Sequence, residues 1–121
     1  MKTCGIVILM LVSFASHATD NKGNYAIWGV GNRSCHGYLQ ARAANDFDKF
    51  KDYLMGFLTA YNVMTPETYS ISGGKNLDEV LIWFDDHCEL QPTISFEQAI
   101  TDFIAENFEQ RMKTSPSSFR R

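Results

Sequence analysis

The two cysteines that lie beyond the N-terminal apolar run constrain the fold of this chain more than any other feature. Cys35 and Cys88 are 53 positions apart, whereas Cys4 precedes the run. In an oxidising compartment two cysteines of one chain most often pair. Closing a loop of this length would stabilise the fold by about 4 kcal/mol in the chain-entropy model. We therefore predict a structural Cys35–Cys88 disulfide.

The first eighteen residues have the features of a secretory signal that is removed on export. Lys2 supplies a positive start, and an apolar run from Ile6 to Phe14 follows it. Ser16 and Ala18 are small residues at the positions that a signal peptidase recognises. The run is too short to span a bilayer, which takes roughly 20 apolar residues. We expect cleavage after Ala18 and delivery of the mature chain to the periplasm or the exterior.

The predicted mature chain carries a moderate negative charge. The whole sequence has 11 basic and 14 acidic residues, which gives a net charge of -3 with histidine neutral. Removal of Lys2 with the signal would make the net charge one unit more negative. This charge does not suit nucleic acid, which is bound by clustered basic residues. No second apolar run is long enough to cross a membrane, so we expect a soluble single domain with no membrane contact.

Apolar residues three and four positions apart predict four helices with buried stripes. The strongest stripe, on the second helix, comprises Phe47, Phe50, Leu54, Phe57, Leu58 and Tyr61. Ser34, Asn76 and Ser95 are suited to cap the first, third and fourth helices. Pro66 and Pro92 end the second and third helices, because proline disfavours helical backbone at the residue before it.

Three further expectations concern the ends of the helices and the connections between them. Between the first two helices the chain either breaks near Asn45 or continues as one bent helix. Glu79 and Gln98 each follow a cap by three positions, so we expect both to complete capping boxes. Residues 65–76, which include two adjacent glycines, are expected to form a long loop.

The expected architecture is all-α, a small bundle of three to four helices clamped by one disulfide. The predicted organisation is a signal peptide at 1–18, an extended or disordered leader at 19–33, a helical domain at 34–112 and a flexible tail at 113–121. Within the leader, the glycine-punctuated apolar run at 25–31 is expected to lie extended across the core.

Cys35-His36 and His87-Cys88 are the residue pairs that most suggest chemistry. Two cysteines and two histidines can hold zinc tetrahedrally, but helical neighbours point about 100° apart and rarely reach one metal. A disulfide would also occupy both sulfurs, so no metal or cofactor is expected. The disulfide would instead bring His36 and His87 into one neighbourhood, which makes them candidate pH sensors near pH 6. Two solvated imidazoles without consequence are the alternative.

No residue set in the sequence predicts catalysis. Asp85 and Asp86 are consecutive, so on a helix they face different ways and are expected on a solvated surface. An oxidised thiol cannot act as a nucleophile. Ser72–Lys75 lacks the spacing of a phosphate-binding loop. We therefore predict no catalytic residues and a protein that is not an enzyme.

The aromatic content predicts a surface for binding other proteins. Nine phenylalanines, five tyrosines and two tryptophans are many for a core of this size. Trp83 lies one residue off the buried stripe of its helix. An exposed aromatic patch on a soluble protein usually marks a partner surface, and ordinary partial burial is the alternative. Phe57, Tyr61 and Trp83 are the candidate contacts.

The segment Arg33–Leu39 (RSCHGYL), followed by Gly56-Phe57 in a long helix and a helical Cys88, resembles the HdeA-type periplasmic acid-stress chaperones. These are small exported helical proteins with one disulfide joining two helices. The resemblance covers roughly residues 28 to 108. It implies a homodimer at neutral pH that dissociates in acid and exposes apolar surface to unfolded clients. A weaker resemblance is to Tai-type immunity proteins, which block a secreted toxin. A third interpretation is an exported family with no assigned activity.

Overall fold

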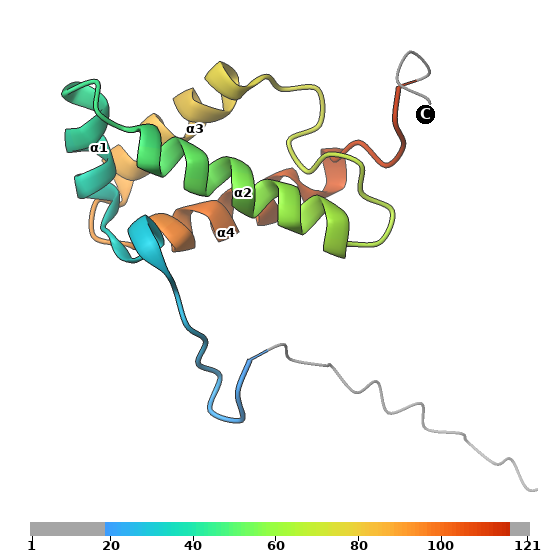
Figure 1. Cartoon of the computed structure of the whole chain (residues 1–121). Coiled ribbons are helices and arrows are strands. Elements are labelled where there is room, and N and C mark those ends of the chain that lie inside the picture. Colours follow the sequence, from blue (N-terminus) through green and yellow to red (C-terminus); the bar gives the residue numbers. More distant parts are fainter. Residues whose placement is uncertain (1–18, 117–121) are drawn as a thin grey trace, which may run out of the picture.

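A computed structural model describes residues 19–116 and shows an all-α fold (Figure 1). Its helices are α1 (Cys35–Ala43), α2 (Asp48–Met64), α3 (Leu77–Leu90) and α4 (Phe96–Asn107), with two short 3-10 turns, η1 (Gly29–Asn32) and η2 (Phe108–Gln110). The part of the chain that the structure describes contains no strand. The predicted fold class is confirmed. The predicted signal peptide and the last five residues of the predicted tail lie outside the described residues.

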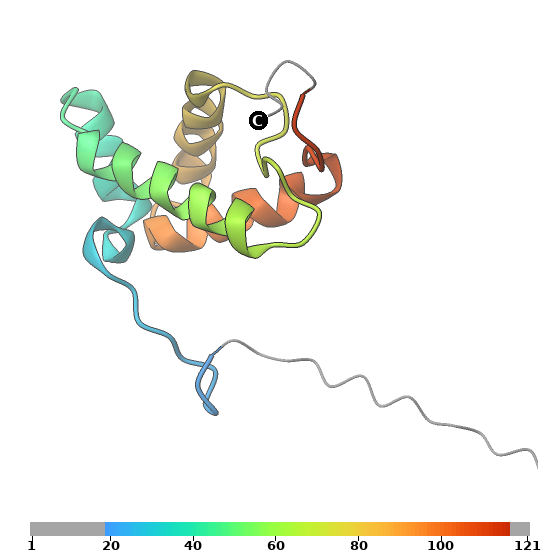
Figure 2. The same cartoon turned by 45° about the vertical axis from the view of Figure 1, so that its right-hand side comes forward.

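The four helices surround one apolar core. α1 packs against α3 and α4, α3 packs against α4, and η1 contacts both α2 and α4. Figures 1 and 2 show α2 (green) crossing the molecule along its outer side, with α4 (orange) behind it. Both views also place the loop after α2 (yellow) beside the C-terminal segment (red) at one end of the molecule.

The break between α1 and α2 occurs at Asn45. Its φ of 52° is in the left-handed region, which asparagine tolerates better than most residues. Its N–H donates to the Arg42 carbonyl at 3.1 Å, and the Asp46 N–H donates to the Ala41 carbonyl at 2.9 Å. This pair of bonds is a Schellman motif, which terminates a helix. The chain therefore forms two helices, and α2 begins at Asp48, slightly later than the start near Asn45 or Asp46 that its apolar stripe and acidic first residues predict.

The predicted caps of α1 and α3 are confirmed. The Ser34 hydroxyl accepts a hydrogen bond from the Gly37 N–H at 3.1 Å. The Asn76 side chain accepts from the Glu79 N–H, and the Glu79 carboxylate accepts from the Asn76 N–H, both at 2.9 Å. The reciprocal pair is a complete capping box. Both helices therefore begin where the sequence predicted.

The predicted capping box of α4 is wrong in one part. The Ser95 hydroxyl accepts from the Gln98 N–H at 3.0 Å, so the cap itself is present. The Gln98 side chain does not return to the Ser95 backbone but donates to Asp102 Oδ1 at 2.9 Å. Asp102 lies one turn further along the same face of α4, so its charged oxygen competes for the amide.

The core is aromatic and draws on α1, α3 and α4 together. The ring of Tyr38 stacks on Phe96 at 5.0 Å between centroids, and Phe84 lies 5.5 Å from Phe96. The predicted inward stripes of α3 and α4 are confirmed by the buried residues Val80, Leu81, Phe84, Cys88, Phe96, Ile100, Phe103 and Ile104. On α2 the buried stripe is narrower, because only Phe50 and Leu54 are buried and the other apolar residues of the stripe are partly exposed.

The apolar run at 25–31 is extended only in its first part. Residues 29–32 form the 3-10 turn η1 instead of continuing as extended chain. Gly31 is buried in this turn, and a side chain there would collide with the ring of Tyr53 on α2. The close approach explains why glycine stands at this position. Before the turn, Trp28 is 81% exposed, and the Tyr25 hydroxyl donates to Glu97 at 3.1 Å.

The loop at 65–76 is fastened to the core. Ile71 within it is fully buried, and its N–H donates to the Asn62 side chain at 2.8 Å. Ser70 and Met112 exchange backbone hydrogen bonds of 2.9 and 3.0 Å, which joins the loop to the segment after η2. The loop therefore closes one end of the helical core.

Candidate functional site

The disulfide joins the first residue of α1 to the C-terminal part of α3. Cys35 and Cys88 are both fully buried, and their Cα atoms are 4.9 Å apart. The N-terminal turn of α1 is also tied to the α3–α4 connection, since the Cys35 N–H donates to the Ile94 carbonyl at 2.8 Å. The predicted pairing is confirmed, and solvent cannot reach the sulfurs in the folded state.

A charged group beside the disulfide reinforces the same contact. Arg42 on α1 donates two hydrogen bonds of 3.0 Å to the carboxylate of Asp85 on α3. The Tyr38 hydroxyl donates to the same carboxylate at 2.7 Å. Burial raises the pKa of Tyr38 well above its ordinary value, and the Asp85 carboxylate adds to this shift. The sequence predicted that Asp85 lies on a solvated face, and this prediction is wrong. Asp85 instead holds α1 against α3.

The two histidines lie in different surroundings. His36 is exposed on α1, where its backbone N–H donates to the Pro92 carbonyl at 2.9 Å. The His87 side chain on α3 is only 17% exposed, and its Nε2 lies 2.9 Å from Asp102 Oδ2 on α4. Its ring stacks on Trp83 at 4.4 Å with an interplanar angle of 19°. A change in His87 charge would therefore act on the α3–α4 contact.

Trp83 belongs to the same contact between α3 and α4. Its indole is half-buried and packs edge-on against Phe84 and Phe103, with ring centroids 5.0 and 5.1 Å away. Its Nε1 donates to the Glu106 carboxylate at 3.1 Å. These neighbours and the His87 ring cover much of the indole. Only the uncovered edge of the Trp83 indole can contact another protein.

The other two aromatic candidates lie together on α2. Phe57 and Tyr61 line an apolar hollow of about 260 Å³ with Ala60 and Met64, and we call these four residues the α2 hollow. Met64 is 80% exposed, and the neighbouring Val63 is 78% exposed. The sequence from position 53 to position 66 contains no charged residue. The C-terminal half of α2 therefore presents uncharged side chains both to the core and to solvent.

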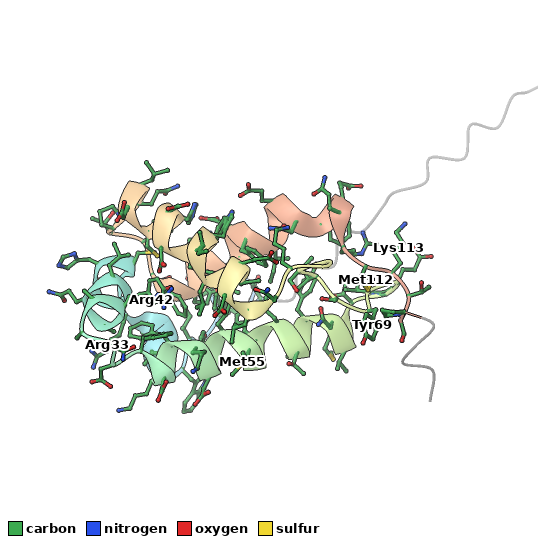
Figure 3. All side chains as sticks on the ribbon, turned by 90° about the horizontal axis from the view of Figure 1, so that it is seen from above. Arg33, Arg42, Met55, Tyr69, Met112 and Lys113 are labelled. Carbon is green, nitrogen blue, oxygen red and sulfur yellow. A yellow bond between two sulfur atoms is a disulfide. The ribbon has the colours of Figure 1, made fainter. Side chains whose placement is uncertain are left out.

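Figure 3 shows where this surface lies on the molecule. It places Met55 midway along α2, with Arg33 toward one end of the molecule and Tyr69 toward the other. Met55 is 40% exposed and Tyr69 is 43% exposed. Uncharged side chains are thus exposed both on α2 and in the loop that follows it, and the charged Glu67, which is also exposed, lies between these two positions in the sequence.

A larger hollow of about 880 Å³ lies among η1, α1 and the start of α2. Small residues line it together with charged residues of both signs, which are Arg33, Lys49, Asp46 and Asp48. These residues come from three separate segments of the chain. No local pattern in the sequence could have brought them together, so this hollow was not predicted.

Among residues 19–116, no group of three or more histidine, cysteine, aspartate or glutamate side chains is placed to hold a metal ion. Within that range no helix is long and apolar enough to cross a membrane. No protein-family model, curated protein or solved structure matched this chain.

Proposed function

We propose that this chain is an exported, non-enzymatic protein that binds other polypeptides through the α2 hollow. The carrying observation is that the uncharged C-terminal half of α2 exposes apolar side chains next to an apolar hollow. Val63 and Met64 stay about four-fifths exposed beside that hollow. Contiguous apolar surface of this kind on a soluble protein generally marks a binding site for a partner.

The size of the α2 hollow favours a polypeptide over a small molecule. Pockets for drug-sized ligands enclose roughly 300–1,000 Å³ and place a few polar groups to orient the ligand. The α2 hollow, at about 260 Å³, is smaller and is lined by Phe57, Ala60, Tyr61 and Met64. It suits one large apolar side chain of a longer chain. Such a site selects for apolar character and accepts many sequences.

The resemblance to the HdeA-type chaperones adds acid activation to this proposal. Asp85 links α3 to α1 through Arg42, and Asp102 links α4 to α3 through His87. In strong acid the 14 acidic residues lose their charge while the basic residues keep theirs, so the chain gains a high net positive charge. Many proteins with such a charge adopt a compact state with loosened side-chain packing. We expect the contacts between helices to loosen below about pH 4 and apolar surface to increase.

Light scattering of an aggregating client protein tests the proposal. The oxidised protein is added at pH 7 and at pH 2–3, and suppression is expected at the lower pH. Tyr61→Ser should lose most of this suppression, because it removes an aromatic wall of the α2 hollow. Tyr69→Ser is the matched control, since Tyr69 is also partly exposed but lies outside that hollow. Absence of suppression at both pH values, or equal loss in the two variants, would contradict the proposal.

The larger hollow supports a second candidate, an inhibitor or immunity protein with one specific partner. Its lining residues Arg33, Lys49, Asp46 and Asp48 offer charges of both signs. Such a lining suits one complementary protein segment, whereas general clients share only apolar character. Pull-down with a Lys49→Glu control tests this candidate. Capture of a single protein at nanomolar affinity that the variant loses, without suppression of client aggregation, would favour it.

A further inference from the structure

The outer side of α3 combines acidic and apolar side chains in solvent. A row with four-residue spacing alternates between the two kinds, in the order Asp78, Ile82, Asp86, Leu90. Ile82 is 56% exposed and Leu90 is 82% exposed. At 3.6 residues per turn this row and two further glutamates span an arc of about 120° on the helix. We call these six exposed residues the α3 face: Asp78, Glu79, Ile82, Asp86, Glu89 and Leu90.

The α3 face belongs to a strongly acidic part of the chain. Residues 76–110 contain no lysine or arginine. α3 and α4 pack together, and Trp83 Nε1 on α3 donates to the exposed Glu106 carboxylate on α4 at 3.1 Å, so the acidic surface continues onto α4. A surface with charges of one sign attracts a partner of the opposite sign. The acidic residues of this part are Asp78, Glu79, Asp85, Asp86, Glu89, Glu97, Asp102, Glu106 and Glu109.

The charges at the C-terminal end of the α3 face oppose the folding of the helix. Glu89 follows Asp86 by three positions and Asp85 by four, and like charges at these spacings repel each other on a helix. Negative charge is also unfavourable at a helix C-terminus, which is the negative end of the helix dipole. Among residues 19–116 none of the ion pairs involves Asp78, Asp86 or Glu89. A positively charged partner would relieve this repulsion.

We propose that the α3 face binds a cationic amphipathic helix of another protein. Rows with four-residue spacing are the ridges by which helices pack against each other. A partner helix that alternates basic and apolar side chains in such a row would place its basic groups against Asp78 and Asp86, and its apolar groups against Ile82 and Leu90. This site is separate from the α2 hollow and takes a partner selected by charge as well as by apolar character.

Fluorescence anisotropy of a dye-labelled synthetic helix at pH 7 tests the proposal. The probe is a peptide of about 20 residues with leucine and lysine alternating at every fourth position. We expect a dissociation constant in the micromolar range that rises with salt. Ile82→Ser and Asp86→Asn should each raise it by about tenfold. A second peptide, with serine in place of each leucine, should also bind about tenfold more weakly.

Asp52→Asn is the matched control. Asp52 is exposed on α2, and its replacement changes the net charge as much as Asp86→Asn does. It should change the dissociation constant by less than about twofold, because a single distant charge is screened by salt. Absence of binding, equal effects of Asp52→Asn and Asp86→Asn, or equal binding of the two peptides would overturn the proposal.

Urea unfolding separates binding from folding. Asp86→Asn removes the repulsion with Glu89, so it should leave the free energy of unfolding unchanged or raise it while probe binding weakens. A marked loss of stability in Asp86→Asn would show that the charge serves the fold, and the proposal would be overturned.

Two further proteins test other occupants and other sites. A chain that ends at Pro116 lacks Arg120 and Arg121. At least about tenfold tighter probe binding by this chain would show that the chain's own basic end occupies the α3 face, which overturns the proposal, whereas unchanged binding supports a separate partner. Tyr61→Ser should leave probe binding unchanged, because the α2 hollow lies on another helix. Probe binding and client suppression can therefore fail independently.

Discussion

Replacing Ile71 by alanine tests whether the loop at 65–76 is part of the core. Ile71 is fully buried although it belongs to no helix. Its N–H is held by Asn62, and its neighbour Ser70 pairs with Met112. The backbone is therefore held by hydrogen bonds at Ile71 and at the residue before it. We expect Ile71→Ala to destabilise the protein as strongly as a substitution in a central helix.

The size of the effect follows from the deleted atoms. At about 0.8 kcal/mol per buried carbon group, loss of the three carbons that distinguish isoleucine from alanine costs about 2.4 kcal/mol. A cavity that cannot collapse adds to this, and measured values for such substitutions are about 2–5 kcal/mol. The backbone bonds around Ile71 oppose collapse. We therefore expect a loss of about 3 kcal/mol in the free energy of unfolding.

Urea unfolding followed by circular dichroism measures this loss at pH 7. Ile82→Ala provides the control, because Ile82 is 56% exposed on α3 and its truncation should change the free energy of unfolding by less than about 0.5 kcal/mol. If Ile71→Ala costs no more than that control, the loop does not contribute to the core. The packing argument for this end of the molecule would then be refuted.

Three further predictions concern the fold. Cys35→Ala with Cys88→Ala should lower the free energy of unfolding by about 4 kcal/mol in urea, because the unfolded chain regains the entropy of a 53-residue loop. Since the pKa of Tyr38 is raised in the folded state, the unfolded state releases this proton first and stability falls as pH rises above about 10. Tyr38→Phe should make this alkaline decline shallower in thermal melts. Gly56→Ala should raise the free energy of unfolding by about 0.5–1 kcal/mol in urea, because alanine is the better helix former and the site is open.

The helices could be predicted from the sequence because their signals are local. A cap such as Ser34 and its N–H partner lie three positions apart, and an apolar stripe repeats within one helix. The disulfide was equally predictable, since only two cysteines remain once the signal is assigned. The end of α1 was left open because Asn45 is compatible with both a helix and a left-handed turn.

The rest of the candidate site depends on contacts that no local pattern encodes. Asp85 resembled a solvated residue, and only the packing of α1 against α3 brings Arg42 and Tyr38 to it. The amide of Gln98 could satisfy either the Ser95 backbone or Asp102, and the choice depends on small differences in geometry. Phe57 and Tyr61 were predicted as partner contacts, but the hollow that they line with Ala60 and Met64 was found only in the fold.

The position of the disulfide has a consequence for local opening. It joins α1 to α3, so all of α2 lies inside the covalently closed loop. α2 could therefore swing away from the other three helices with both of its ends still tethered and no covalent bond strained. Phe50 and Leu54 are its only buried residues. Native-state hydrogen exchange should therefore show α2 amides opening at lower free energy than those of α3 and α4. In the oxidised protein, α2 would then open as one unit while α1, α3 and α4 stay packed together.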